Sequence, residues 1–147
     1  MELNFPTYDF KFRTEQQKKF IFDVVRKKFI PLTPEEWVRQ HCIHYLRAEK
    51  KASIGLMQVE KQQKFNNLSL RFDVALFRQD GSVDCIIECK RPSVPITKET
   101  LLQAARYYQG LKPRFIWLTN GMEHVWFSFV NNKISLLPDG PEDFTNT

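Results

Sequence analysis

Residues 71–91 read RFDVALFRQDGSVDCIIECKR, a pattern that predicts a β-hairpin. Two runs rich in β-branched and aromatic residues flank Asp80-Gly81, and an Asp-Gly pair in that position favours a hairpin turn. We expect this pair to form a two-residue type I′ loop. Counting outward from such a loop sets Asp73 directly opposite Glu88 on the neighbouring strand.

The two faces of this hairpin differ in character, because side chains alternate along a strand. One face is apolar and is the expected core: Phe72, Val74, Leu76, Cys85, Ile87 and Cys89. The other face is mixed and carries the charges: Arg71, Asp73, Ala75, Phe77, Asp84, Ile86, Glu88 and Lys90. Like charges directly opposite one another destabilise a ladder. A hairpin that keeps Asp73 beside Glu88 must therefore solvate them, protonate one, or supply a cation. A solvated outer face remains the plainer interpretation.

The rest of the chain predicts strands and helices on both sides of the hairpin. The expected strands cover residues 8–13, 20–25, 53–60, 114–119, 124–130 and 134–137, with polar turns at 16–19 and 61–67. The strand at 114–119 is so apolar that it should be central. One helix should begin with Thr33 as N-cap, Pro34 at N1 and Glu36 at N3 of a capping box, and end near residue 50. A second helix should cover residues 97–109.

The composition favours one globular domain with an anionic partner. The chain has 147 residues and a net charge of +5, which is long enough for one domain with a real core. We expect a single domain over residues 1–147, with an N-terminal β extension at 1–31, a core at 32–130 and a polar tail at 138–147. Nucleic acid is the commonest partner of a basic protein. The basic cluster at 26–28 is interpreted as solvated surface, with a phosphate contact as the alternative.

Cysteine usage and hydropathy indicate a cytoplasmic protein with no membrane partner. Cys42, Cys85 and Cys89 are odd in number and lack a paired spacing, which fits reduced, buried thiols. No segment approaches the ~20 apolar residues of a membrane span, and the N-terminus lacks the pattern of a signal peptide. His41 and His44 lack a second ligand cluster, so we do not expect zinc.

The charged end of the hairpin has the residue types that phosphodiester hydrolysis needs. Mg²⁺ takes oxygen ligands and keeps several waters, so Asp73 and Glu88 with one main-chain carbonyl are sufficient protein ligands. A metal ion activates water and neutralises charge that develops on the phosphate. Lys90 lies two residues after Glu88 on the same strand face, where an ammonium group can position water or stabilise an oxyanion.

Other motifs combine with this hairpin. They are an acidic residue at a helix start, the hairpin residues, and a Gln-x-x-x-Tyr pair on the next helix: Glu36, Asp73, Glu88, Cys89, Lys90, Gln103 and Tyr107. Together they resemble the PD-(D/E)XK nuclease superfamily, most closely the N-terminal nuclease domain of the R subunit of type I restriction enzymes, including small stand-alone proteins built on that domain. The segments that carry the likeness are 32–40, 87–90, 92–96 and 118–121.

The resemblance implies a restriction-endonuclease-like three-layer α/β fold, in which helices flank a central mixed β-sheet. It also implies cleavage of DNA that depends on Mg²⁺ or Mn²⁺. By this resemblance, Asp73 and Glu88 would bind the metal together with the main-chain carbonyl of Cys89. Lys90 would be the catalytic lysine.

The same resemblance implies roles for residues on the two helices. Glu36 would be the auxiliary acidic residue, in addition to any part it plays in capping. Gln103 and Tyr107 would orient the site and contact DNA. The chain departs from the family in having Phe72 where proline is usual. We do not expect it to carry the motor domain of full R subunits, and therefore do not expect translocation-coupled cleavage as its own activity.

Three functions remain open from the sequence. The first is a metal-dependent DNA endonuclease in restriction or DNA processing, acting as a homodimer or with a partner DNA-processing protein, since one site cuts one strand. The second is a catalytically idle nuclease-fold module that binds DNA or recruits a partner, because so small a domain offers little surface for DNA. The third is a basic globular domain whose polar hairpin face is structural.

Overall fold

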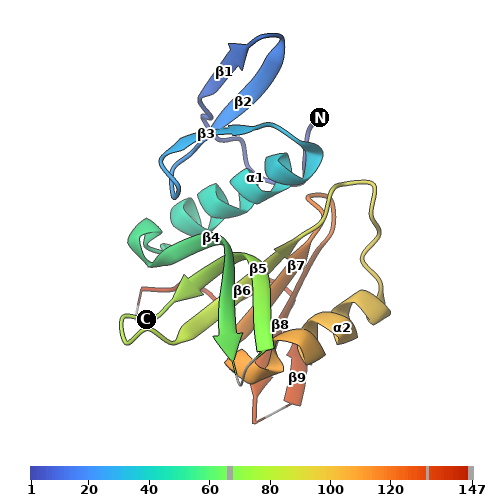
Figure 1. Cartoon of the computed structure of the whole chain (residues 1–147). Coiled ribbons are helices and arrows are strands. Elements are labelled where there is room, and N and C mark those ends of the chain that lie inside the picture. Colours follow the sequence, from blue (N-terminus) through green and yellow to red (C-terminus); the bar gives the residue numbers. More distant parts are fainter. Residues whose placement is uncertain (66–67, 132, 146–147) are drawn as a thin grey trace.

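The computed structural model describes residues 1–65, 68–131 and 133–145, which form a three-stranded sheet, a six-stranded sheet and two α-helices (Figure 1). The strands are β1 (Phe12–Glu15), β2 (Lys18–Asp23), β3 (Lys28–Pro31), β4 (Met57–Phe65), β5 (Leu68–Phe77), β6 (Val83–Cys89), β7 (Phe115–Thr119), β8 (His124–Val130) and β9 (Lys133–Leu136). The helices are α1 (Pro34–Ala48) and α2 (Lys98–Tyr108), with 3-10 turns at Ile54–Leu56 and Gln109–Leu111.

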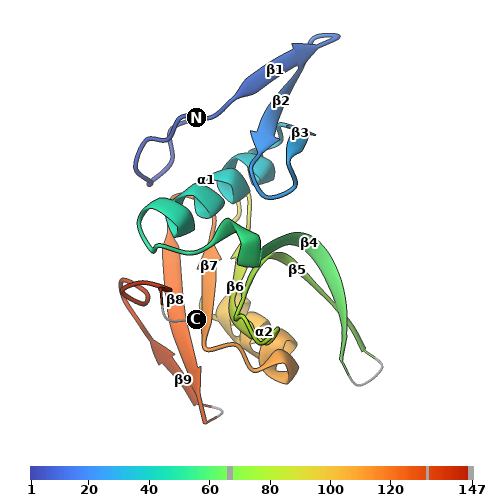
Figure 2. The ribbon, with the colours of Figure 1, turned by 90° about the vertical axis from the view of Figure 1, so that its left-hand side faces the viewer.

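The larger sheet is mixed and has the order β4-β5-β6-β7-β8-β9. Its neighbouring strands are antiparallel except β6 and β7, which are parallel. Parallel neighbours need a crossover connection, and α2 supplies it. Figures 1 and 2 show α1 lying between the two sheets, whereas α2 lies against the larger sheet away from β1–β3. The expected α/β fold with a central mixed sheet between helices is confirmed.

Each helix covers its own hydrophobic core. The α1 face of the sheet is packed mainly by Val38, Cys42, Ile43, Leu46, Val74, Leu76, Cys85, Ile87, Trp117 and Trp126. The α2 face is packed mainly by Phe72, Ala75, Val83, Ile86, Ala104, Ala105, Tyr108, Ile116 and Phe127. Strand β7 is almost wholly buried between β6 and β8, so the predicted central strand is confirmed.

The predicted register of the organising hairpin is confirmed next to its charged end. Val74 pairs with Ile87, and Leu76 pairs with Cys85, as the counting from residues 80 and 81 requires. The predicted face assignment is only partly right. Ala75 and Ile86 are fully buried rather than on an outer face, because α2 covers that side of the sheet.

The predicted two-residue type I′ loop is wrong. The Arg78 N–H donates to the Ser82 carbonyl at 2.8 Å, and the Gly81 N–H donates to the Arg78 carbonyl at 3.0 Å, so three residues form the tip. Gly81 has φ +90°, a conformation that glycine adopts without steric cost. Asp80 Oδ1 accepts the Ser82 N–H at 2.9 Å. The longer tip would shift the pairing of the two strands, but a bulge after Leu76 compensates for that shift. The predicted register is therefore kept from Leu76 toward Val74.

The N-terminal extension has three strands, and not the two that were expected. Strands β1 and β2 pair antiparallel, and β3 adds to β2. Strand β3 begins at the last residue of the basic cluster at 26–28, where the sequence predicts no strand. Farther along, β4 continues through the expected polar turn as far as Phe65, and residues 66 and 67 of that turn lie outside the described residues.

Helix α1 begins where the sequence predicts, but its capping differs. Thr33 is the N-cap, and its Oγ1 accepts the Glu36 N–H at 3.0 Å. The reciprocal half of a capping box is absent from α1, because the Glu36 carboxylate pairs with Arg26, Arg39 and Gln40. Neither helix in the described part of the chain is long and apolar enough to span a membrane.

Candidate active site

A pocket of about 710 Å³ opens between the start of α1, strands β5 and β6, and helix α2. It brings together most of the residues that the sequence singled out: Asp73, Glu88, Cys89, Lys90, Gln103 and Tyr107. Glu35, Arg71 and Arg106 also line it. We call this the acidic pocket, since three of its lining residues are carboxylates.

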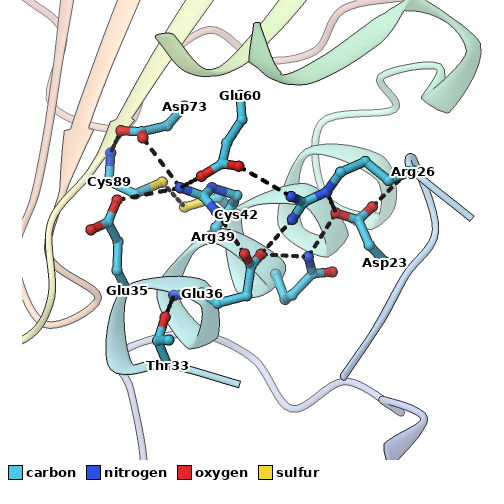
Figure 3. Close-up of polar contacts among 11 residues, drawn as sticks. Asp23, Arg26, Thr33, Glu35, Glu36, Arg39, Cys42, Glu60, Asp73 and Cys89 are labelled. Atoms are coloured by element: carbon cyan, nitrogen blue, oxygen red, sulfur yellow. Dashed lines mark hydrogen bonds and ion pairs between the residues drawn. The ribbon is translucent and has the colours of Figure 1, made fainter. Parts of the chain in front are cut away.

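Asp73 is fixed to the neighbouring strand and to α1. Its Oδ2 accepts the main-chain N–H of Cys89 at 2.8 Å, and its Oδ1 lies 3.3 Å from Nη2 of Arg39 (Figure 3). A carboxylate with a partner on each oxygen has little rotational freedom. Asp73 therefore presents one fixed orientation to the acidic pocket.

Arg39 lies at the centre of four carboxylates (Figure 3). It is buried on α1 and approaches Glu35 at 3.3 Å, Glu36 at 2.6 Å, Glu60 at 3.2 Å and Asp73 at 3.3 Å. Burial alone lowers the pKa of the Arg39 guanidinium, but the surrounding negative charge, led by Glu36, raises it above its usual value. The cation compensates for an acidic cluster that would otherwise repel itself.

The structure sets Glu36 outside the lining of the acidic pocket. Its carboxylate accepts from Arg26 at 2.9 Å, from Arg39 at 2.6 Å and from Gln40 at 2.9 Å. Glu36 therefore holds Arg39 in position and joins α1 to the N-terminal extension. The auxiliary acidic role implied for Glu36 stays a prediction.

Glu35 lines the acidic pocket although the sequence did not single it out. Burial and the charge of Asp73 raise the pKa of the Glu35 carboxyl, while Arg39 and Lys90 lower it in part. Its position next to Glu36 at a helix start is the only signal in the sequence that indicates a site residue. Neighbouring side chains differ in direction by more than a quarter of the helix circumference, so Glu35 can line the pocket while Glu36 does not.

Glu88 and Lys90 project from the end of β6 toward the same space. Lys90 Nζ lies 3.9 Å from Glu88 Oε1. Burial raises the pKa of the Glu88 carboxyl; Lys90 opposes this, and Asp73 and Glu35 add to it. A bound cation would relieve the repulsion that these neighbouring carboxylates exert on Glu88.

Helix α2 forms the opposite wall. Tyr107 Oη accepts the main-chain N–H of Arg71 at 2.9 Å, and Tyr108 Oη donates to the Arg71 carbonyl at 3.2 Å. The two tyrosines therefore hold β5 against α2 beside the acidic pocket. Gln103 lines the acidic pocket from the same helix.

The donor set is compatible with a hard divalent cation that keeps several waters. Asp73 and Glu88 supply carboxylate oxygens on adjacent strands, and Glu35 lines the same pocket. Within the described residues, no three His, Cys, Asp or Glu side chains form a ready group of metal ligands. His41 Nδ1 contacts the Trp37 carbonyl at 2.8 Å.

A mixed sheet between helices, with an aspartate in β5 and a glutamate and a lysine at the end of the adjacent β6, defines a nuclease-like α/β protein. The chain belongs to the family described as type I restriction enzyme R protein N terminus (HSDR_N), whose model matches residues 34–141. The matched region includes the whole acidic pocket and leaves out β1–β3. Comparisons with curated proteins and with solved structures found no match.

Proposed function

We propose that this protein is a metal-dependent DNA endonuclease that hydrolyses phosphodiester bonds, acting in restriction in the cytoplasm. The observation that carries the proposal is the convergence of Asp73, Glu88 and Lys90 on one pocket. The family supports it, because its printed description names a restriction enzyme. The net charge of +5 favours the polyanionic substrate.

In the proposed hydrolysis, the residues of the acidic pocket have different roles. Asp73, Glu88 and the main-chain carbonyl of Cys89 would hold Mg²⁺ or Mn²⁺, which activates water and neutralises phosphate charge when bound. Lys90 stabilises negative charge on the phosphate oxygens and orients the attacking water. Glu35 accepts a hydrogen bond from that water on the α1 side.

A plasmid-nicking assay tests this function. The native chain should relax supercoiled DNA in Mg²⁺ or Mn²⁺, and Lys90→Ala should lose that activity by at least about 100-fold, as expected for removal of an oxyanion-stabilising group. Lys133→Ala, on the exposed edge strand β9, is the matched control and should cut at the native rate. Equal cutting by native and Lys90→Ala protein would contradict the proposal.

A nuclease-fold module that binds DNA or recruits a partner without cutting is the second candidate. The observation in its favour is that both oxygens of Asp73 already have protein partners, Cys89 and Arg39. Such a module need not bind metal. A rise in Tm of the native chain with millimolar Mn²⁺, absent in Asp73→Asn, would favour the enzyme.

The products of the nicking assay also bear on the number of sites that act together. Nicked plasmid without linear product would indicate that one active site acts each time the protein binds DNA. Linear product would favour a homodimer or a partner protein.

A further inference from the structure

The net positive charge of the chain lies in a segment outside the region that matches the family. Residues 11–28 include seven Lys and Arg and two Asp and Glu, so this segment has a net charge of +5, equal to that of the whole chain. It contributes to β1, β2 and β3, which project beyond α1 at one end of the molecule (Figure 2). We call residues 11–31 the N-terminal arm. Its net charge attracts polyanions, whereas the remainder of the chain is formally neutral.

The lysines of the arm are available to a ligand. Lys18, Lys27 and Lys28 are exposed, and they form no ion pair with any described residue. Arg26 differs, because it is bound to Asp23 at 2.6 Å and serves to attach the arm to α1. The arm is therefore anchored by one cation and presents the others to solvent.

A groove of about 550 Å³ lies between the arm and the start of α1. Phe12 and Lys19 line it from the arm, Trp37 lines it from α1, and Arg91 lines it from the segment after β6. The Phe12 and Trp37 ring centroids are 6.1 Å apart, and Lys19 Nζ is 4.6 Å from the Phe12 centroid. Aromatic rings bordered by cations are the means by which proteins hold unpaired bases and their phosphates.

The two aromatic side chains of the groove offer ring surface rather than hydrogen-bonding groups. Phe12 is 44% exposed. The only polar atom of the Trp37 side chain, Nε1, donates to the Met1 carbonyl at 2.8 Å. A ligand in the groove is therefore recognised by stacking and by charge, which suits any nucleobase.

The groove adjoins the acidic pocket along two chain segments. Pro34 lines the groove and Glu35 lines the acidic pocket; in the same way, Arg91 lines the groove and Lys90 lines the acidic pocket. Consecutive residues are about 3.8 Å apart at Cα. A DNA strand with one phosphate at Lys90 thus has a neighbouring nucleotide within reach of the groove.

We propose that this groove holds one unpaired nucleotide of the DNA strand that enters the acidic pocket, while the lysines of the arm contact the backbone. The inference rests on the nuclease function proposed above and names its substrate class: DNA with a single-stranded segment. A base within a duplex would first have to leave its stack, at an energetic cost, whereas an unpaired base enters directly.

Fluorescence of Trp37 tests the proposal without any requirement for cleavage. The other two tryptophans, Trp117 and Trp126, are 1% and 4% exposed, so a stacked base quenches Trp37 alone. The full chain is titrated with an oligo(dT) strand of about 12 nucleotides, within the range of single-strand site sizes, in buffer that contains EDTA. We expect quenching in the native chain and none in Trp37→Phe. A duplex of equal length should quench weakly.

Variants separate the stacking contact from the charge contact. Phe12→Ala and Phe12→Leu should each weaken oligo(dT) binding by about tenfold, because leucine fills space without a π-system. Lys19→Gln and Arg91→Gln should each reduce the salt slope of log K by roughly 0.7, the value for one phosphate contact on a single strand. Lys133→Gln, on β9, is the matched control and should bind as the native chain does.

The outcomes distinguish this inference from the proposed function. Absence of quenching, with plasmid cutting that still depends on Lys90, would overturn the inference and leave the nuclease function intact. Equal quenching by duplex would overturn the requirement for an unpaired nucleotide. Quenching that depends on Phe12 in a protein that never cuts DNA would support the groove and count against the nuclease.

Discussion

Nη2 of Arg39 lies 3.3 Å from Oδ1 of Asp73, and this contact joins α1 to the middle of β5. The other oxygen of Asp73 accepts the Cys89 N–H of β6, so one aspartate links three elements of the fold. Arg39 is thus a positioning residue for Asp73. A buried cation among carboxylates is costly to desolvate, and its removal is costlier still because it leaves the carboxylates unpaired.

Arg39→Met should lower the free energy of unfolding by about 3 kcal/mol in metal-free buffer, because several carboxylates lose their buried partner. Millimolar Mg²⁺ should restore part of that loss, since a bound cation replaces the missing positive charge. Urea unfolding with EDTA and with Mg²⁺ measures both effects. Arg13→Met removes an exposed ion pair with Glu15 and should cost less than about 1 kcal/mol. An Arg39→Met protein as stable as this control would show that the cluster does not depend on Arg39.

Substitution of the two glutamates at the start of α1 should have different effects. Glu36→Gln should destabilise the fold by about 3 kcal/mol, because it breaks buried ion pairs with Arg26 and Arg39. Glu35→Gln should change stability by less than about 1 kcal/mol, since its side chain is 47% exposed, yet weaken the Mg²⁺ dependence of cutting. Thermal unfolding and nicking at several Mg²⁺ concentrations measure these quantities. Full stability with lost cutting in Glu36→Gln would instead support the auxiliary catalytic role.

Glu88→Gln should stabilise the metal-free protein. Burial, together with the charges of Asp73 and Glu35, raises the pKa of the Glu88 carboxyl, so its charged form destabilises the folded state at neutral pH. The amide removes that charge, and Tm should rise by about 2 °C in EDTA. The Tm increase that Mg²⁺ gives the native chain should disappear. Glu123→Gln, at an exposed position, should change neither quantity; a lower Tm for Glu88→Gln in EDTA would contradict repulsion within the pocket.

Local sequence patterns predict the strand register, which depends on the alternation of apolar and polar residues, and the helix start, which depends on a capping residue. The register at Val74 and Ile87 followed from strand periodicity and the Asp-Gly pair, even though the loop itself differs. Thr33 was correctly predicted as the N-cap of α1. Both features depend on residues close together in the chain, and such features are the ones that sequence patterns specify well.

Features that depend on how elements dock could not be predicted in this way. The sequence predicts where α1 begins. Whether Glu35 or Glu36 lines the acidic pocket depends on the rotation of the helix about its own axis, and tertiary packing sets that rotation. The burial of Arg39 had one local signal, since Glu35 and Glu36 precede it by four and three residues. Its contacts with Glu60 and Asp73 are long-range. The outer face of the hairpin is buried for the same reason, because α2 docks on it.

Asp23→Asn should make the protein less sensitive to acid while lowering its stability at neutral pH. Asp23 is buried and accepts from Val25 N at 2.7 Å, Arg26 Nε at 2.6 Å and Gln40 Nε2 at 3.0 Å. Burial alone would raise the pKa of its carboxyl, but the hydrogen bonds from Arg26 and Gln40 lower it below the usual value. The stability that this carboxylate contributes is therefore present above the unfolded pKa of about 3.9, and it is lost as pH falls through the lower folded pKa.

The measurement is urea unfolding of native and Asp23→Asn protein between pH 7 and pH 3. At pH 7 the variant should be less stable by about 3 kcal/mol, the cost of breaking a buried ion pair, and the difference should shrink below about pH 4, where protonation of Asp23 begins in the unfolded chain. Asp139→Asn, at an exposed position, should follow the native curve at every pH. A difference that stays constant from pH 7 to pH 3 would mean that the amide fails for steric reasons and that the charge of Asp23 does not attach the N-terminal arm to α1.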